Sequence, residues 1–458
     1  MPYPSRRQRR LVRALVLVAA VVALAGGSLN VASAAPPAPS FSAPIRLGFP
    51  NGDDWEPSIA ADDHGHAYAL WNHYVGFGGS SLGDVDPSCP DCPSPHMVIQ
   101  VSNDNGTTWA PPHALAPSET RQDDPQIVVD AGNGRTVYAA YMEGDKSSLF
   151  VARSDDFGQT FRPVLVEDIE RGLDKIALAA RNGHVYLSYH SQQKIFVSVS
   201  HDGGATWTVT QPVTSTNSSL GVSLPSGATI APDLTAYMAF NGVNRPGQAK
   251  GTINLYVART VDGGATWSIS RVAVSQAPAP CGCGAWDWWG AQIAIGSDAA
   301  GVVYVLWNQN SAKYGPHRML FARSTDRGGT WSAPVDVSLA PNGTNNVFPA
   351  LVAGGKNDVR IAWQDDRNGF DAGDNDSDAR WNTYYRRSGD GGAKWSAEAK
   401  LSAFVPSYTY KFATPKDGYL QPYGDYFEID IDSEDDTVAL WGEGNSYFGP
   451  GNVWFAGE

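Results

Sequence analysis

Short runs of alternating apolar and polar residues, separated by Gly, Asp and Asn, recur along almost the whole chain. Such runs predict β-strands joined by tight turns. They come in groups, in which a pair of apolar runs split by a turn, as in 57–71 and 125–141, precedes an alternating run such as 96–102 and a further short strand. The pattern therefore predicts repeated units of four antiparallel strands.

A turn motif of the form Ser/Thr-x-Asp-x-Gly-x-Thr-Trp, or close to it, lies between the third and fourth strands of six units. The Asp accepts hydrogen bonds from nearby backbone N–H groups, the Gly is free to adopt positive φ, and the aromatic residue anchors the turn between sheets. The copies follow one another at intervals of 46 to 64 residues and begin at Ser102, Ser154, Ser200, Thr260, Ser324 and Ser388. This period indicates a repeat architecture.

A seventh unit lacks the motif and also lacks one strand. Residues 427–441 supply its first two strands and 451–458 its third, whereas 41–48 near the N-terminus reads like the fourth strand of an earlier unit. We therefore expect the N-terminal strand to complete the last unit and close a ring. The predicted fold is all-β, a seven-bladed β-propeller of four-stranded antiparallel blades.

The chain is expected to divide into three parts. Residues 1–34 have the arginine-rich start, apolar stretch and small-residue cleavage site of a signal peptide, and the stretch is too short to span a membrane comfortably. Residues 35–40 form a Pro-rich leader, and 41–458 form a single propeller domain. This organisation predicts a secreted, extracellular protein with no membrane span.

The charge of the chain narrows the choice of partners. The formal net charge is −14, and it becomes −19 without residues 1–34, which carry five Arg and no acid. An acidic surface of this kind excludes nucleic acid and anionic membranes as partners.

Four cysteines form two close pairs, Cys89 with Cys92 and Cys281 with Cys283. In an exported chain such pairs predict two disulfides, either local or between loops. A zinc site with four thiolates is the alternative, and the spacing of Cys281 and Cys283 fits it poorly.

Candidate chemistry gathers at one end of the predicted ring. The first strand of a propeller blade is innermost, so the starts of first strands and the ends of second strands meet at one mouth of the central channel. The six motif turns then lie on the opposite face. Solvated loop ends are often acidic without any function, but a concave mouth focuses charge. The acidic candidates for catalysis are Asp54, Glu56, Asp123, Asp124, Asp174 and Asp366. The candidates for substrate binding are Arg121, Arg171, Arg367, His73, His190, Trp288, Trp289 and Asp425.

A metal site is one further expectation. Asp374, Asp376 and Asp378 alternate along one loop, which places their oxygens on the same side, as a hard Ca²⁺ ion requires. The alternative is a solvated acidic loop, since the Gly and the distal Glu of an EF-hand are absent. Calcium is therefore a possible cofactor, and no other cofactor is expected.

The six motifs resemble those of the Asp-box, or BNR repeat, superfamily of β-propellers that includes the sialidases, although the match to true sialidases is not close. The resemblance implies a protein that acts on extracellular glycans or glycoconjugates. Sialidases have six blades, an Arg-Ile-Pro motif, an arginine trio for the substrate carboxylate, a Tyr/Glu nucleophile pair and an Asp acid/base. Here the nearest sequence to that motif is 45–47, on an outer strand, and the candidates for the trio are Arg121, Arg171 and Arg367.

Three functions are compatible with these features. The first is an exo-glycosidase-type hydrolase, whose carboxyl groups would lie about 5 Å apart for retention or about 6.5–9.5 Å apart for inversion. The second is a uronate polysaccharide lyase, with His73, His190 or Tyr189 as base and Arg121 or Arg171 against the uronate. The third is a propeller that binds a glycan or a protein without catalysis. The sequence favours a glycan-directed role, and it leaves catalysis and the oligomeric state open.

Overall fold

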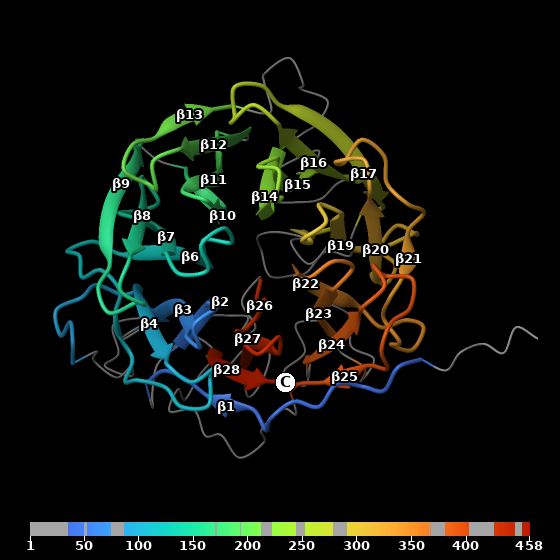
Figure 1. Ribbon diagram of the computed structural model, residues 1–458, viewed down its shortest axis with the longest axis horizontal. Helices are drawn as coiled ribbons and strands as arrows, with labels where there is room; N and C mark the ends of the chain where they lie inside the picture. The colour runs from blue at the N-terminus through green and yellow to red at the C-terminus, as the bar shows by residue number, and fades with distance from the viewer. Residues whose placement is uncertain are drawn as a thin grey trace, which may run out of the picture. The chain divides into compact units, whose positions relative to one another are not determined.

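Seven four-stranded antiparallel sheets stand around a common axis (Figure 1), as the sequence predicts. The computed structural model describes residues 35–49, 53–74, 87–169, 172–192, 194–211, 222–243, 252–277, 291–365, 367, 381–402, 426–444 and 451–458. Within these ranges Ala35–Glu458 form one compact unit of strands and turns without a helix. No apolar helix long enough to cross a membrane occurs among the described residues.

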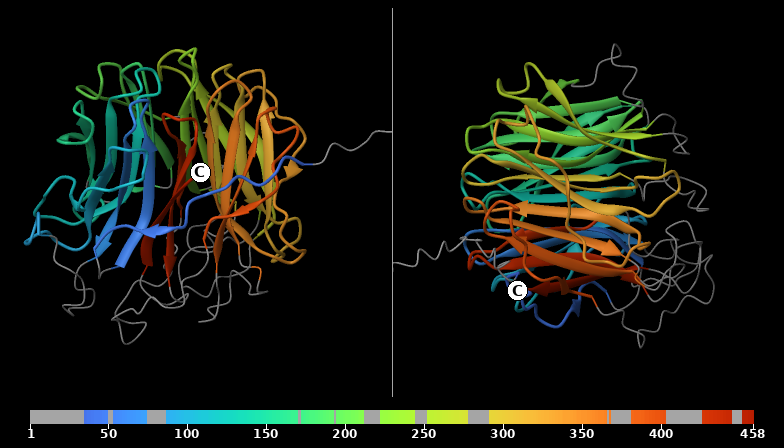
Figure 2. Two further views of the ribbon diagram at one scale, coloured as in Figure 1. Left: turned by 60° about the horizontal axis from the view of Figure 1, so that its bottom comes forward. Right: turned by 90° about the vertical axis from the view of Figure 1, so that its right-hand side faces the viewer.

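Each blade contributes its first strand to the inside of the ring and its fourth to the rim (Figures 1 and 2). The first three blades comprise β2 (Asp53–Ala61), β3 (Ala67–Tyr74), β4 (His96–Ser102) and β5 (His113–Ala114); β6 (Gln122–Val129), β7 (Val137–Glu143), β8 (Ser148–Ser154) and β9 (Arg162–Asp168); and β10 (Asp174–Arg181), β11 (His184–Ser191), β12 (Lys194–Ser200) and β13 (Thr208–Thr210).

The remaining blades follow the same order. They comprise β14 (Val222–Ile230), β15 (Ala236–Val243), β16 (Ile253–Thr260) and β17 (Ser268–Ser275); β18 (Ile293–Ser297), β19 (Val303–Gln309), β20 (Arg318–Ser324) and β21 (Val335–Asp336); β22 (Asn346–Ala353), β23 (Val359–Asp365), β24 (Asn382–Ser388) and β25 (Ala399–Lys400); and β26 (Glu428–Ile431), β27 (Thr437–Gly444) and β28 (Gly451–Gly457) with β1 (Ile45–Arg46).

The N-terminal strand closes the ring. Strand β1 pairs antiparallel with β28, so that Ile45 lies opposite Phe455, and the Ser42 N–H donates to the Gly457 carbonyl at 2.8 Å. The prediction that 41–48 completes the last blade is therefore confirmed. Closure in this way pairs both ends of the chain into one sheet and leaves no long unpaired strand at the seam.

Apolar side chains fill the spaces between blades. Seven clusters of buried residues each join two consecutive blades. The one at the seam brings Trp71 of the first blade, and Phe49 of the segment that leads into it, against Leu440 and Phe455 of the last. Trp71 and Trp441 are fully buried at the corresponding position of the second strand. Because every blade buries both faces, the core is a ring of apolar layers rather than a single centre.

The six motif turns are built from their own hydrogen bonds. In the first, the Ser102 hydroxyl donates to Asp104 Oδ1 at 2.8 Å and accepts from the Gly106 N–H at 2.8 Å, while the Thr108 hydroxyl donates to Asp104 Oδ2 at 2.6 Å. The bonds from Thr108 hold the pKa of Asp104 below its ordinary value. The motif aspartates thus bond within their own turns, which is consistent with the structural role that the sequence predicts for them.

The motif turns lie at the end of each blade where the first strand turns into the second. The Asn105 N–H donates to the Gly65 carbonyl at 2.9 Å, and the Gly391 N–H donates to the Asn357 carbonyl at 2.8 Å. These bonds join a motif to the hairpin between the first two strands of its own blade. The starts of the first strands consequently lie at the opposite face, which we call the mouth.

Candidate functional site

The first strands of several blades carry a β-bulge close to the mouth. The pairing register shifts between Trp55 and Ser58 in β2, between Asp123 and Gln126 in β6, and between Asp174 and Ile176 in β10. The bulge residue has positive φ in each case, 55° for Glu56, 54° for Asp124 and 47° for Lys175. A bulge redirects the side chain that it carries, and positive φ in a non-Gly residue is strained. Three consecutive blades therefore present an ionisable side chain from an equivalent strained position.

Glu56 lies at the centre of this group. Its carboxyl accepts a hydrogen bond from Asn72 Nδ2 at 2.9 Å and lies 3.6 Å from Lys175 Nζ. Burial, and after it the neighbouring carboxylate of Asp124, raises the pKa of Glu56 well above its ordinary value. The shift favours the protonated form of Glu56, and a hydrogen bond to Asp124 contributes to it.

Lys146, in the turn after β7, joins the second blade to the third. Its ammonium group lies 2.7 Å from Asp174 Oδ1 and 3.5 Å from Asp124 Oδ1. Burial lowers the pKa of Lys146, but Asp124, Asp174 and Glu56 outweigh burial and the net pKa lies well above the ordinary value. Burial likewise raises the pKa of Asp174, but Lys146 and Lys175 outweigh it and hold that carboxyl ionised.

Tyr426, just before β26, completes the group from the last blade. Lys175 Nζ lies 5.7 Å from the centroid of its ring, and its hydroxyl donates to the Pro125 carbonyl at 2.9 Å. Burial, followed by the charges of Glu56 and Asp124, raises the pKa of Tyr426 well above its ordinary value. We call Glu56, Asp124, Lys146, Asp174, Lys175 and Tyr426 the mouth cluster.

A cavity of about 320 Å³ lies inside the ring and is lined by the first strand of every blade, with Lys175 and Tyr426 among its walls. Two acids of β26 face it. Glu428 bonds to the Ser58 hydroxyl and Asp430 accepts from the Ala61 N–H at 2.8 Å. Burial raises the pKa of Glu428 to about 7 and that of Asp430 to about 6. The cavity therefore joins the mouth cluster to two further carboxyl groups that protonate near neutral pH.

The sequence-predicted residues divide into those that the structure brings together and those that it places elsewhere. Glu56, Asp124 and Asp174 meet in the mouth cluster, and His190 is the register partner of Asp174. Their positions in three different blades converge because the first strands surround one axis (Figure 1).

Asp54 and His73 lie instead in the core of the first blade. Both are fully buried, with His73 Nδ1 2.7 Å from Asp54 Oδ1 and Trp71 Nε1 donating to the same oxygen at 2.9 Å. The ring of Phe49 packs 4.8 Å from that of His73. This arrangement anchors the N-terminal segment and gives these two residues a structural position.

Two arginines of the predicted trio, Arg121 and Arg367, lie among the described residues, and each pairs with acids of its own blade. Arg121 forms a bidentate bond with Asp123, at 2.9 Å and 2.6 Å. Arg367 pairs with Asp365 at 3.0 Å and with Glu398 at 2.7 Å. Its guanidinium also lies 3.6 Å from the centroid of the Tyr384 ring, on the third strand of the sixth blade. Arg121 and Arg367 thus belong to separate blades and to separate ion pairs.

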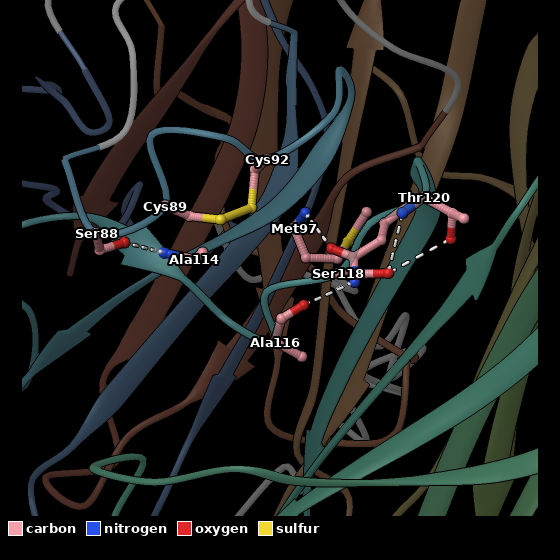
Figure 3. The surroundings of a disulfide bond; sticks show 9 residues. Ser88, Cys89, Cys92, Met97, Ala114, Ala116, Ser118 and Thr120 are labelled. Carbon is pink, nitrogen blue, oxygen red and sulfur yellow. Dashed lines mark hydrogen bonds between the residues drawn. A yellow bond between two sulfur atoms is a disulfide. The ribbon is translucent and has the colours of Figure 1, made fainter.

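The other predicted residues lie outside the described residues. They are Arg171, Trp288, Trp289, Asp366 and Asp425, together with the predicted calcium ligands Asp374, Asp376 and Asp378. Cys281 and Cys283 also lie there. Cys89 and Cys92 form a disulfide with each other, next to the Ser88 hydroxyl that accepts from the Ala114 N–H at 2.9 Å (Figure 3). The first pair therefore makes a local disulfide.

Sequence reasoning did not select Lys146, Tyr426 or Glu428. A repeated signal was available for the bulges, since Glu56, Asp124 and Phe348 each precede a Pro and each has positive φ. Lys146 gives no such signal, because it lies in a turn, and its contact with Asp174 arises only through the packing of two blades.

The mouth cluster combines groups of opposite proton affinity. Burial shifts Glu56 towards its protonated form, whereas the ammonium groups of Lys146 and Lys175 favour the ionised form of Asp174. Lys146 contacts Asp174, and Lys175 lies 3.6 Å from Glu56. Two carboxyl groups whose pKa values are pushed apart can serve as acid and base in one reaction. The ammonium groups can also hold a hydroxyl or an anionic oxygen of a ligand.

Comparison with known proteins supports the repeat and the fold. Residues 83–278 match the model of the BNR repeat-like domain, which confirms the predicted resemblance from β4 of the first blade to β17 of the fourth. The comparison with curated proteins gave no match.

Solved structures share the architecture at low identity. A protein of unknown function from Dyadobacter fermentans has a TM-score of 0.50 and 12% identity, over 91% of this chain and 98% of that one. An ulvan lyase from a new family of polysaccharide lyases has a TM-score of 0.50 and 10% identity, over 89% of this chain and 95% of that one. A Hadza microbial sialidase has a TM-score of 0.46 and 15% identity, over 88% of this chain and 65% of that one. Identities this low show the fold alone.

Proposed function

We propose that this sialidase-like BNR propeller is a glycan hydrolase of the exo type that acts at the mouth, with Glu56 as general acid and Asp174 as the ionised carboxylate. The observation that carries the proposal is that Lys146 and Lys175 join the two carboxyl groups in one cluster, at 2.7 Å from Asp174 and 3.6 Å from Glu56. Their pKa values are shifted in opposite directions there. Glycoside hydrolysis needs one protonated and one ionised carboxyl group near the scissile bond.

Asp124 would position the acid rather than react. Its charge and its hydrogen bond keep the proton on Glu56, and its Oδ2 accepts from the Lys175 N–H at 2.9 Å. The direct contact with Glu56 leaves no room for a sugar between these two carboxyl groups, since retaining enzymes separate theirs by about 5 Å. Asp174 is therefore the better partner for Glu56.

Exo action follows from the enclosure of the acid. The Glu56 side chain is 2% exposed, whereas that of Asp174 is 28% exposed. The neighbouring cavity, whose walls include Lys175 and Tyr426 of the mouth cluster, has about 320 Å³ and lies at the lower end of the range of small-molecule pockets. A terminal sugar fits such a space better than the middle of a polymer does.

The same proposal places the protein outside the cell. A disulfide between Cys89 and Cys92 is typical of exported proteins, and residues 1–34 have the pattern of a signal peptide. N-terminal sequencing of protein recovered from the culture medium would test this, and a chain that still begins at Met1 would contradict it.

The test of the function is a glycan panel of sialosides, neutral oligosaccharides and uronate polymers, with products read by mass spectrometry. Hydrolysis adds one water to the products. We expect release of a terminal sugar by the wild type and its loss in Glu56→Gln and Asp174→Asn. Glu434→Gln makes the same chemical change as Glu56→Gln on an exposed turn far from the mouth, and it should retain full activity.

A parallel incubation with a calcium chelator tests the predicted ligands Asp374, Asp376 and Asp378. Activity that falls on chelation and returns with Ca²⁺ would support a calcium requirement. Unchanged activity would remove it from the proposal.

A polysaccharide lyase is the second candidate, because cations and a His side chain lie beside an acid at the mouth. Lys146 contacts Asp174, and the charge of His190 acts on the same carboxyl. A lyase would yield unsaturated products without added water. If the panel instead leaves every glycan intact while binding is retained, the mouth is a recognition site.

A further inference from the structure

Two histidines on the face opposite the mouth approach each other closely. His184 begins β11, and His201 follows Ser200 in the third motif turn. Their Nδ1 atoms lie 2.8 Å apart, with ring centroids 5.0 Å apart and ring planes at 70°. This pair takes no part in the mouth cluster.

A contact with the next blade fixes the protonation of His201. Its Nε2 lies 3.0 Å from the Gly263 carbonyl oxygen, and a carbonyl can only accept, so Nε2 carries the proton. Neutral His201 then has a bare Nδ1, and the hydrogen between the two rings belongs to His184. Gly263 permits the approach, because it has a φ of +74° and a Cβ there would lie 3.0 Å from His201 Cε1.

We propose that His184 and His201 form a binding site for a divalent transition metal of the Cu²⁺ and Ni²⁺ class. Imidazole nitrogen is a preferred ligand of these ions. A ligating His usually donates its other ring N–H to a backbone carbonyl or a carboxylate, and His201 already does so. Binding requires the His184 proton to move from Nδ1 to Nε2, which exposes a second lone pair with no net loss of a proton.

The spacing of the two nitrogens selects the ion. Two neighbouring ligands in a square-planar field, each about 2.0 Å from the metal, lie about 2.8 Å apart, whereas two ligands of tetrahedral Zn²⁺ lie about 3.3 Å apart. The observed 2.8 Å matches the first value. The rings must tilt on binding, since each nitrogen now points at the other. The described residues bring no group of three metal-binding side chains together, so water would fill the remaining positions.

A buried carboxylate near the pair favours a cation. Asp130 is fully buried, and its Oδ2 accepts a hydrogen bond at 2.7 Å from the N–H of Gly183, the residue before His184. A buried negative charge close to the pair attracts a metal cation.

Titration of the full chain, without a histidine tag, with Cu²⁺, Ni²⁺ or Zn²⁺ tests the site by calorimetry and by electron paramagnetic resonance of bound Cu²⁺. We expect affinities in the order Cu²⁺, Ni²⁺, Zn²⁺, and a Cu²⁺ signal split by two nitrogens. His184→Asn and His201→Asn should each weaken Cu²⁺ binding at least tenfold. His113→Asn, which removes an imidazole from the rim strand β5, should change nothing.

The control and the spectra make the result decisive. Thermal unfolding of the two variants verifies that the fold is kept, and the spectrum reports the ligands independently of affinity. Cu²⁺ binding that survives both substitutions unchanged would overturn the proposal. So would the absence of any bound metal, which would leave the pair as a hydrogen bond between two blades.

Discussion

Carboxyl groups at the mouth and at the motif face have pKa values shifted in opposite directions. At the motif face, Asp262 accepts bonds from the hydroxyl and the N–H of Thr266, and these bonds lower its pKa to about 2. At the mouth, burial raises the pKa of Glu56 well above its ordinary value. The motif aspartates accept hydrogen bonds from residues of their own turns, whereas the protonation of Glu56 depends on residues from other blades.

This contrast separates scaffold from site without reference to conservation. A motif aspartate is surrounded by donors within four residues of it, so its environment is nearly the same in five of the six motifs. Glu56 and Asp124 of the mouth sit on strained bulges, and Glu56 lies near the ammonium group of Lys175 from another blade. Perturbed pKa values with partners distant in sequence mark a candidate functional site.

Matched substitutions in the two regions should affect different quantities, activity at the mouth and thermal stability at the motif face. Glu56→Gln is expected to lower kcat by about 100-fold to 10,000-fold, since it removes the proposed proton donor, while the melting temperature stays within about a degree. Asp202→Asn should leave kcat unchanged and lower the melting temperature by about a degree or two, because the bond from Thr206 weakens. Kinetics and thermal unfolding of both variants check this. Equal effects of the two substitutions on kcat would remove the distinction.

The pH dependence of activity provides a finer test of the mouth. Glu56 must be protonated to act as an acid, so activity should fall as the pH rises through its raised pKa. Lys175 lowers the pKa of Glu56, so Lys175→Met should move this fall to higher pH. The measurement is kcat/KM against pH for both proteins. A fall that does not move, or that moves to lower pH, would exclude Glu56 as the group that titrates.

Stability should also depend on pH in opposite directions in the two regions. Between about pH 4.5 and 7 the unfolded chain releases the proton of Glu428 while the folded chain keeps it, so folding weakens as the pH rises. For Asp262 the folded pKa is the lower one, so its contribution is present above pH 4 and lost as the pH falls towards 2.

Glu428→Gln isolates the first of these contributions. Where the folded and unfolded pKa values of a group differ by one, the free energy of unfolding changes by about 1.4 kcal/mol. The Glu428 side chain keeps some solvent contact, which reduces the effect. We therefore expect the free energy of unfolding of the wild type to fall by about 2 kcal/mol between pH 4.5 and 7 because of Glu428, and that of Glu428→Gln to lack this fall. Denaturant unfolding of both proteins across this range gives the difference. A difference that stays constant with pH would mean that Glu428 does not titrate there.

The fold was predictable because it is repetitive. Each motif turn marks the position of one blade in the sequence. The likeness of 41–48 to a fourth strand was enough to predict where the ring closes. Local signals that recur from blade to blade outweigh the errors of any single strand assignment.

The site was only partly predictable, because bulges break the alternation that orients side chains. Asp54 and Glu56 are two residues apart and should share a face of β2, yet Asp54 bonds to Trp71 and Glu56 lies near Asp124. The bulge after Trp55 separates them. His73 shows a second limit, since its Nδ1 lies 2.7 Å from Asp54 Oδ1 inside the blade, a buried partner that the sequence pattern did not reveal.

The smallest expected effect concerns the sixth motif, which departs from the others. Five motifs have a Thr whose hydroxyl donates to the motif aspartate. The sixth has Lys394 at that position, so Asp390 accepts from the Lys394 N–H and the Ser388 hydroxyl, each at 2.8 Å, but from no Thr hydroxyl. Lys394→Thr restores the hydroxyl and should stabilise the fold by a few tenths of a kcal/mol, because an exposed hydrogen bond contributes less than a buried one. Lys394→Val, which has the shape of Thr without its hydroxyl, is the matched control in denaturant unfolding. If Thr and Val give the same stability, the motif hydroxyl contributes nothing to the turn; if only Thr stabilises it, each motif is an independent unit that can be improved without touching the mouth.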